Sequence, residues 1–600
     1  MSIYSSRLEA LRTELSNRQL DGFVIPLTDE HMSEYVGDYA LRLQWLTGFQ
    51  GSAGTAAVLP GMAAIFTDGR YKVQVRDQVD GALYSYQDVP AVQPADWLEA
   101  EASKGMRIGY DAWLATKTWA RATETRLKAK GISLTPADGN PIDAIWPDQP
   151  APSAAPLSVH EDEFAGQSGA EKRAQIADWL KSETADAVVI AALDSVAWTL
   201  NIRGSDVSHT PVALAFAVVR SDGTATLFVE PGKVTPEVRA HMGADVDVAP
   251  RDGFAAALEQ MGKDGLTVAL DPSSCVAAIF QLLAAAGAKI IERRDPALLP
   301  KAVKNDTELE GSRAAHIRDG GAVTRFLKWI EETAPGGELD ELGAAAKLHD
   351  IRRESNLLRD LSFDTISAAG PNAALPHYRV SEESNRKIAL NSIFLCDSGG
   401  QYTDGTTDVT RTVVVGTPTD EMKERFTRVL KGHIALATQT FPKGTRGTQL
   451  DSLARMHLWR GGVDYGHGTG HGVGSFLAVH EGPQRISAAN YPGAGADEPL
   501  RAGMILSNEP GYYKEGEYGI RIENLVIVEP REIDGAEGEY LGFETITFAP
   551  IDLNLVAAEM LTSEERDWLN GYHDDVRAKI TPELKNAEDQ AWLANATRAI

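Results

Sequence analysis

Cysteine is nearly absent from the sequence, with only Cys275 and Cys396 among 600 residues. Two thiols cannot provide the disulfide framework that is typical of small secreted proteins. The first residues, MSIYSSRLEALRTEL, carry charged side chains where a secretory signal peptide needs an apolar run. Together these absences predict a cytoplasmic protein.

A long hydrophobic run is also lacking. The longest nearly apolar stretch, CVAAIFQLLAAAGAKII from Cys275, is interrupted by Gln281 and falls short of the roughly 18 residues that span a bilayer. This stretch predicts a buried helix, and we expect no membrane partner.

Basic residues are outnumbered, since 58 Lys and Arg face 85 Asp and Glu, for a formal net charge of -27. A protein that binds nucleic acid needs a basic surface to displace counterions from phosphates, so we expect no nucleic-acid partner. The excess of carboxylates predicts a solvated, self-repelling surface. Apolar residues at 43% and charged residues at 24% otherwise match an ordinary folded protein.

The chain is too long for a single hydrophobic core, and its pattern predicts three domains. Residues 1–150 alternate helical and apolar strand patterns, as an α/β domain does. The proline-rich segment PDQPAPSAAPL predicts a linker. Residues 151–307 repeat the same order loosely, which predicts a second α/β domain. The third domain, 308–600, follows a helix cap at Asn305 or Asp306 and ends in a helical extension.

Two carboxylates of the third domain lie in a predicted hairpin. The stretch SIFLCDSGGQYTDGTTDVTRTVVVG predicts an apolar strand, a glycine-rich turn and a returning strand. Asp397 closes the first strand and Asp408 lies in the second, while Asp404 precedes a glycine and is expected in the turn. An antiparallel return can bring Asp397 and Asp408 side by side, which is unfavourable unless a cation lies between them.

A second stretch, GMILSNEPGYYKEGEYGIRIENLVIVEP, repeats this arrangement, with Glu509 before the turn and Glu523 in a predicted buried strand. Each acid alone has an ordinary alternative, because single acidic residues usually lie in turns, face water or form ion pairs. Four carboxylates from two hairpins, together with one imidazole, would balance the charge of two divalent cations. The joint pattern therefore predicts a two-metal site.

Histidine is concentrated in one glycine-rich segment. The stretch YGHGTGHGVGSFLAVH carries His467, His471 and His480, out of 13 histidines in the chain. Glycine lets the backbone pass close to a metal or a peptide, where a Cβ would intrude. His377 lies just before the first hairpin, in the loop GPNAALPHYR. These four are the candidate site histidines.

A family resemblance rests on five motifs: AAGPNAALPHYR, DSGGQYTDGTTDVTRT, GHGTGHGVGSFLAVHEGP, SNEPGYY and GIRIENLVIV. They closely resemble the three-domain, cytosolic type of Xaa-Pro aminopeptidase, a pita-bread metallopeptidase of family M24. HMSEY, GFQGSAGTA and FTDGRY resemble the first domain of that family, NIRGSDV its second, and KAVKNDTELEG the start of its catalytic domain. The resemblance covers most of the chain. It implies two tandem creatinase-N-like α/β domains followed by a C-terminal pita-bread catalytic domain of mixed α/β and α+β character.

The resemblance implies a dinuclear metal site. The five implied ligands are Asp397, Asp408, His471, Glu509 and Glu523. Asp397 and Asp408 would bind one ion, and the other three would join Asp408 on the second ion or bridge, with Asp408 and Glu523 as the bridging carboxylates. For this oxygen-rich ligand set the family suggests two manganese ions per chain, and zinc, cobalt and iron stay open.

Other residues are expected to act around the metals. The resemblance implies that His377, His467 and His480 hydrogen-bond the substrate and the developing tetrahedral intermediate, and that Glu509 also shuttles a proton. Arg521 lies two residues before Glu523, so on a strand it faces the same side and can neutralise the carboxylates. Tyr513 is a further candidate neighbour of the site, with core packing as the alternative.

By resemblance, the reaction is hydrolysis of the bond between an N-terminal residue and a following proline, with a hydroxide held by the two metals as nucleophile. A homodimer is implied in the same way. Three alternatives are a prolidase-type Xaa-Pro dipeptidase, a metal-free creatinase-like amidinohydrolase and a catalytically inactive pita-bread binding module. The three-domain length argues against the first, and the complete ligand set argues against the other two.

Overall fold

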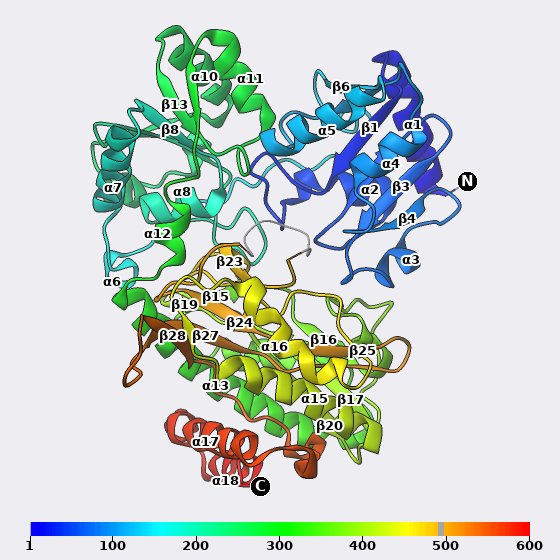
Figure 1. Cartoon of the computed structure of the whole chain (residues 1–600), viewed down its shortest axis with the longest axis vertical. Helices are drawn as coiled ribbons and strands as arrows, with labels where there is room; N and C mark the ends of the chain where they lie inside the picture. The colour runs from blue at the N-terminus through cyan, green and yellow to red at the C-terminus, as the bar shows by residue number, and fades with distance from the viewer. Residues whose placement is uncertain (1, 490–496) are drawn as a thin grey trace. The chain divides into compact units, whose positions relative to one another are not determined.

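The computed structural model describes residues 2–489 and 497–600, and the chain folds into two compact units, Met1–Leu298 and Leu299–Ile600. Figure 1 traces the first unit from blue to green and the second from green to red. Among the described residues, no helix is both long enough and apolar enough to cross a membrane.

The first unit contains two six-stranded mixed sheets of the same topology. The first sheet has the order β4-β3-β2-β1-β5-β6, and β1 pairs antiparallel with β2 and parallel with β5. Its strands are β1 (Gly22–Pro26), β2 (Thr55–Val58), β3 (Ala63–Thr67), β4 (Ser85–Asp88), β5 (Arg107–Tyr110) and β6 (Ser133–Pro136).

The second sheet has the order β12-β11-β10-β8-β13-β14, and β8 pairs antiparallel with β10 and parallel with β13. Its strands are β8 (Ala187–Ile190), β10 (Phe216–Arg220), β11 (Ala225–Phe228), β12 (Val246–Ala249), β13 (Thr267–Leu270) and β14 (Lys289–Glu292). The loose repeat in the sequence therefore corresponds to a repeated strand order.

Helices contribute apolar faces to these cores. In α1 (Ile3–Asn17), Leu8 and Leu11 are spaced by about one turn and are buried in the core of the first sheet. The apolar run at Cys275, expected as one buried helix, instead forms α11 (Ala277–Ala286) and then β14. The helix ends because Gly287 adopts the left-handed conformation, with φ 101°.

The second unit begins with α12 (Leu298–Ala302), which crosses the division, and the long helix α13 (Asp306–Thr333). Of the two predicted caps, Asn305 is the one used: it forms a capping box with Glu308. Further helices are α14 (Glu341–Arg352), α15 (Asp420–Ala437) and α16 (Gly447–Trp459).

Two sheets of the second unit carry the predicted hairpins, in the orders β16-β17-β20 and β21-β28-β27-β24-β22-β23. The first consists of β16 (Ile366–Ala369), β17 (Ser392–Ser398) and β20 (Val409–Val415). The second consists of β21 (Phe441–Pro442), β22 (Gly470–Gly472), β23 (Glu481–Ile486), β24 (Ile505–Asn508), β27 (Asn524–Arg531) and β28 (Tyr540–Thr545).

Both hairpins are more elaborate than predicted. In the first, the short paired strands β18 (Gly400–Tyr402) and β19 (Gly405–Thr406) lie between β17 and β20, and Asp408, predicted in the returning strand, directly precedes β20. β17 and β20 pair antiparallel from Ser392 with Val415 to Ser398 with Val409. The second stretch was predicted as strand, turn and strand, but the separate hairpin of β25 (Gly511–Lys514) and β26 (Tyr518–Arg521) lies between β24 and β27. Glu523 therefore lies in a break between two strands rather than within one strand, because the chain leaves one sheet there and enters another.

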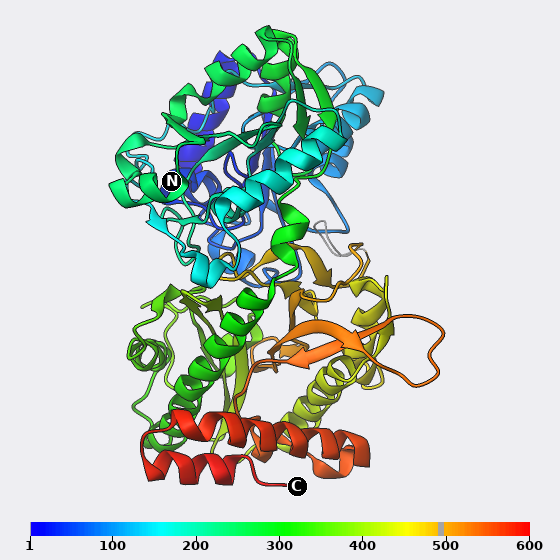
Figure 2. The ribbon, with the colours of Figure 1, turned by 90° about the vertical axis from the view of Figure 1, so that its left-hand side faces the viewer.

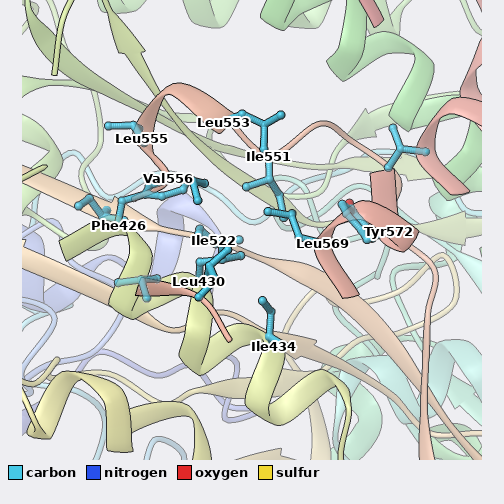
Figure 3. Packing of buried hydrophobic residues seen from close by; sticks show 14 of the residues in the cluster. Phe426, Leu430, Ile434, Ile522, Ile551, Leu553, Leu555, Val556, Leu569 and Tyr572 are labelled. Carbon is cyan, nitrogen blue, oxygen red and sulfur yellow. The ribbon is translucent and has the colours of Figure 1, made fainter. Parts of the chain in front are cut away.

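A large core lies behind this region. It joins α15 to the C-terminal helix α17 (Ser563–Ile580), and it also includes Ile522, which directly precedes Glu523. Figure 3 shows Phe426 and Leu430 of α15 close to Ile522 in this packing. In Figure 2, α17 and α18 (Ala587–Ala596), in red, lie across the lower end of the green helix α13, which both helices contact. The segment that carries Glu523 is thus fixed by a dense apolar layer.

Candidate metal centre

The two hairpins place the four carboxylates at strand ends. Ser398 and Val409 are the last pair of β17 and β20, so Asp397 and Asp408 lie together at that end of the ladder. On the other sheet, Asn508 pairs with Asn524 at the end of β24 and β27, which leaves Glu509 and Glu523 just beyond the last pair.

A backbone hydrogen bond and a side-chain hydrogen bond join the two carboxylate pairs. The amide of Glu523 donates to Thr410 O at 3.2 Å, and the hydroxyl of Thr410 donates to Glu523 Oε2 at 2.7 Å. Strand β20, which follows Asp408, is thereby tied to the residue that carries the fourth acid.

His471, on β22, faces this cluster. Its Nδ1 lies 2.9 Å from Gly472 O, which fixes the proton on Nδ1 and leaves the lone pair of Nε2 available as a ligand. Nε2 lies 3.6 Å from Asp408 Oδ2 and 3.4 Å from Glu509 Oε1. Ligand atoms of Asp408, His471 and Glu523 all lie within 4.8 Å of one another, a spacing that suits a shared metal ion.

The electrostatics of the cluster call for cations. Asp397 Oδ1 and Asp408 Oδ1 are buried, and neither has a hydrogen-bond partner among the described residues. Burial, followed by repulsion from the neighbouring carboxylates, raises the pKa of Asp408 and of Glu523 well above the usual range. Burial likewise raises the pKa of Glu509 to about 7. Orphaned carboxylate oxygens beside one imidazole fit divalent cations.

A chain of hydrogen bonds leads from the cluster to His467. Arg521 Nη2 donates to Asp397 Oδ2 at 2.5 Å, and Nη1 donates to Tyr513 OH at 2.6 Å. Tyr513 OH lies 2.8 Å from His467 Nε2, while His467 Nδ1 lies 2.7 Å from Gly468 O. With the proton on Nδ1, the Tyr513 hydroxyl donates to Nε2. Arg521 and Tyr513 therefore connect Asp397 to His467.

The other two candidate histidines lie beside His471. The rings of His471 and His480 are 4.3 Å apart between centroids, and those of His480 and His377 are 6.4 Å apart. The three imidazoles come from three separate segments: β22, the residue before β23, and the loop after β16. This row lies beside the carboxylates and can supply several hydrogen-bonding groups to a bound peptide.

Sequence reasoning missed two hydroxyl residues that orient the acids. Thr410 bonds Glu523 and also accepts from Arg521 Nε at 3.1 Å. Ser507 Oγ donates to Glu509 Oε1 at 3.1 Å and accepts from the amide of His471 at 2.9 Å. Thr410 lies two positions after Asp408, and Ser507 lies two positions before Glu509. Side chains two positions apart on a strand share a face, which is the signal that also places Arg521, and it could have found both hydroxyls.

Glycine in this segment is required mainly by strand packing. A Cβ on Gly470 would lie 2.0 Å from Ser507 O, a backbone atom of β24. Glycine was expected to make room for a metal or a peptide. At Gly470, one residue from His471, it instead allows β22 and β24 to approach each other closely.

Removing one negative charge should stabilise the metal-free protein. A group whose pKa is raised by folding contributes stability that is present below its unfolded pKa and is lost as the pH rises through its folded pKa. Asp408 has a raised pKa, so it destabilises the metal-free fold at neutral and higher pH. We expect Asp408→Asn to raise the unfolding free energy of chelated protein by about 1 to 3 kcal/mol at pH 8, and by much less at pH 5.

Calorimetry in the presence of a chelator measures this difference. Asp404→Asn is the matched control, because Asp404 is ion-paired with Arg318 at 2.6 Å and that substitution should destabilise the protein at both pH values. A chelated Asp408→Asn protein that unfolds at a lower temperature than wild type at pH 8 contradicts the prediction.

Comparison with known proteins places this site in a family context. The family model for metallopeptidase family M24 matches residues 310–530, and the model for the C-terminal region of peptidase M24 matches residues 539–600. Two family models for the creatinase/prolidase N-terminal domain match residues 7–145 and residues 148–308.

Relatives of similar length extend the match to the whole chain. A probable Xaa-Pro aminopeptidase P of Aspergillus niger is 40% identical over 613 residues, which cover 99% of this chain and 99% of the relative. One of Penicillium rubens is 40% identical over 616 residues, again with 99% of both chains covered. The crystal structure of an X-prolyl aminopeptidase from Caenorhabditis elegans, described as a cytosolic enzyme with a di-nuclear active site, superposes with a TM-score of 0.95 at 35% identity and covers 100% of both chains.

Proposed function

Because this chain belongs to metallopeptidase family M24, we propose that it is an Xaa-Pro aminopeptidase, which removes the N-terminal residue from peptides whose second residue is proline. The observation that carries the proposal is the buried cluster around Asp408, His471 and Glu523, whose ligand atoms lie within 4.8 Å of one another. A structural pita-bread module would have no need of orphaned, mutually repelling carboxylates in its core.

The chain supplies the ligands and the groups around them. The residues that would hold two divalent cations are Asp397, Asp408, His471, Glu509 and Glu523. When bound, such a pair lowers the pKa of a shared water and polarises the scissile carbonyl. Arg521 offsets the negative charge of the cluster through its bond to Asp397.

Proton transfer and substrate contacts fall to other groups. Glu509 accepts a proton from the attacking water and passes it to the proline nitrogen, which has no hydrogen of its own in the peptide. His480 and His467 hydrogen-bond the oxyanion or the leaving group, and His377 orients the substrate. Tyr513 holds His467 through the bond described above.

The same proposal includes the resident metal, the oligomeric state, the compartment and the domain bounds. We assign manganese as the resident metal, because oxygen ligands dominate the site. We also propose a homodimer in the cytoplasm, with domains at 1–150, 151–307 and 308–600. The peptide substrate carries proline in its second position.

The test is turnover of the tripeptide Arg-Pro-Pro by chelated protein after addition of manganese, zinc, cobalt or iron. We expect about two ions per chain and release of free arginine that a chelator abolishes. Cleavage of an Xaa-Pro dipeptide without cleavage of the tripeptide would identify a prolidase instead. Protein that binds no metal and cleaves neither peptide would identify a binding module.

A further inference from the structure

A buried acid outside the metal cluster lies at the centre of a hydrogen-bond network. Glu341, the first residue of α14, has 0% of its surface exposed. Its Oε1 accepts from the amide of Ala369 at 2.7 Å, and its Oε2 accepts from the amide of Arg386 at 2.9 Å. Asn372 Nδ2 lies 3.0 Å from both oxygens, and Tyr378 OH donates to Oε2 at 2.9 Å. The Glu341 carboxylate is the acceptor in all of these hydrogen bonds.

Three of the four donors belong to the loop that carries His377. Ala369 ends β16 at the start of the loop, Asn372 lies in the 3-10 turn Gly370–Ala374, and Tyr378 directly follows His377. Glu341 therefore binds the loop at its start, its middle and its end. Asn372 and Tyr378 also bond each other at 2.9 Å, which closes the network on the loop side.

The opposite side of the loop is held by close packing. A Cβ on Gly519 of β26 would lie 1.7 Å from Ala373 O, so the loop backbone rests directly on that strand. The same strand carries Arg521, which binds Asp397. The loop is thus confined between Glu341 and a strand of the metal site, and His377 has little freedom to shift.

Only a carboxylate satisfies these donors. Each oxygen of Glu341 accepts from a backbone N–H, one from Ala369 and the other from Arg386. A glutamine in either orientation would point its NH₂ group at one of these backbone donors, which cannot turn away. Position 341 is therefore specific for an acceptor-only side chain. It is remote in sequence from the five predicted metal ligands.

We propose that Glu341 is a positioning residue for the peptidase reaction: it fixes the His377 loop so that His377 meets the substrate. The inference rests on the role of His377 in the proposed function. Glu341 itself touches neither the metal ligands nor the other site histidines through any bond described above, and acts through Ala369, Asn372 and Tyr378. Misplacement of a substrate-orienting group by about 1 Å can lower the rate by about 10²-fold.

A double-mutant cycle tests the coupling. We expect Glu341→Gln to lower kcat/KM for Arg-Pro-Pro by about 10 to 10²-fold with the metal content unchanged. The double variant Glu341→Gln with His377→Ala should be no slower than His377→Ala alone, because the carboxylate acts through that imidazole. Tyr378→Phe, which removes one donor and no charge, should produce a smaller loss in the same direction.

The control is Asp340→Asn, which changes the adjacent cap of the same helix. Asp340 accepts from the amide of Gly343 at 2.9 Å, and asparagine caps a helix about as well, so the substitution removes a neighbouring charge but should leave thermal stability and kcat/KM nearly unchanged. The inference is overturned by losses that multiply in the double variant, by a full loss in Asp340→Asn, or by a His377→Ala protein as active as wild type.

Crystal structures of wild type and Glu341→Gln give a result that does not depend on activity. We expect His377 to be displaced in the variant while Asp397, Asp408 and His471 stay in place. An undisplaced His377 overturns the inference. If wild type fails to cleave Xaa-Pro peptides, the proposed function falls, and the two structures still decide whether Glu341 places His377.

Discussion

Replacing His471 with alanine should remove at least one metal ion per chain and lower kcat/KM by about 10³-fold or more. Among the described residues, His471 is the imidazole that groups with Asp408 and Glu523, and its Nε2 lies 3.4 Å from Glu509 and 3.6 Å from Asp408. Without it the remaining ligands are carboxylates that repel one another. Loss of a metal removes both the activation of water and the polarisation of the carbonyl. Metal content by mass spectrometry and steady-state kinetics measure the two effects.

His480→Ala is the matched control for that variant. The two rings are neighbours, 4.3 Å apart between centroids, so both substitutions open a similar space beside the acids. Only His471 is a predicted ligand, and His480→Ala should therefore keep both ions and lower turnover by about 10² to 10³-fold, as loss of one oxyanion donor does. Equal metal loss in the two variants would show that the division of roles between them is wrong.

Local sequence patterns were enough to predict the acids of the first hairpin. Asp397 and Asp408 lie at the same end of one antiparallel strand pair, and the register of such a pair follows from the apolar alternation of its strands. The same reasoning predicted a helix start capped by Asn305 or Asp306, and α13 uses Asn305. Both features depend on contacts between residues that are near one another in the chain.

Features that depend on distant contacts were not predictable in this way. The break at Glu523 exists because β26 pairs with β25 while β27 pairs with β24, and a single continuous apolar pattern does not reveal this change of partner. The bond between Tyr513 and His467 likewise joins two separate segments. The two-residue spacing on a strand predicted that Arg521 would face the same side as Glu523, but the partner that Arg521 binds, Asp397, is set by the packing of two sheets.

Glutamine at position 509 should retain the metals and lower kcat by about 10² to 10⁴-fold, the usual contribution of a general base. Glu509 accepts a hydrogen bond from Ser507 Oγ at 3.1 Å, and a glutamine can keep that bond and one metal contact through its carbonyl oxygen. An amide cannot take the proton of the attacking water, so turnover falls while binding is preserved. Assays at saturating manganese, with metal content measured in parallel, test this separation.

The pH profile identifies the proton acceptor. Burial raises the pKa of Glu509 from 4.5 to about 7 in the absence of cations, and bound cations favour the charged form and lower it again. A base works only when deprotonated, so the kcat of wild type should fall as the pH drops through a value between 4.5 and about 7. Glu509→Gln should lack this acidic limb of the pH profile. Ser507→Ala keeps the carboxylate and should keep the limb with less than about a tenfold loss of kcat. A Glu509→Gln protein with two ions per chain and a wild-type acidic limb would mean that another group accepts the proton, and it would leave Glu509 as a ligand only.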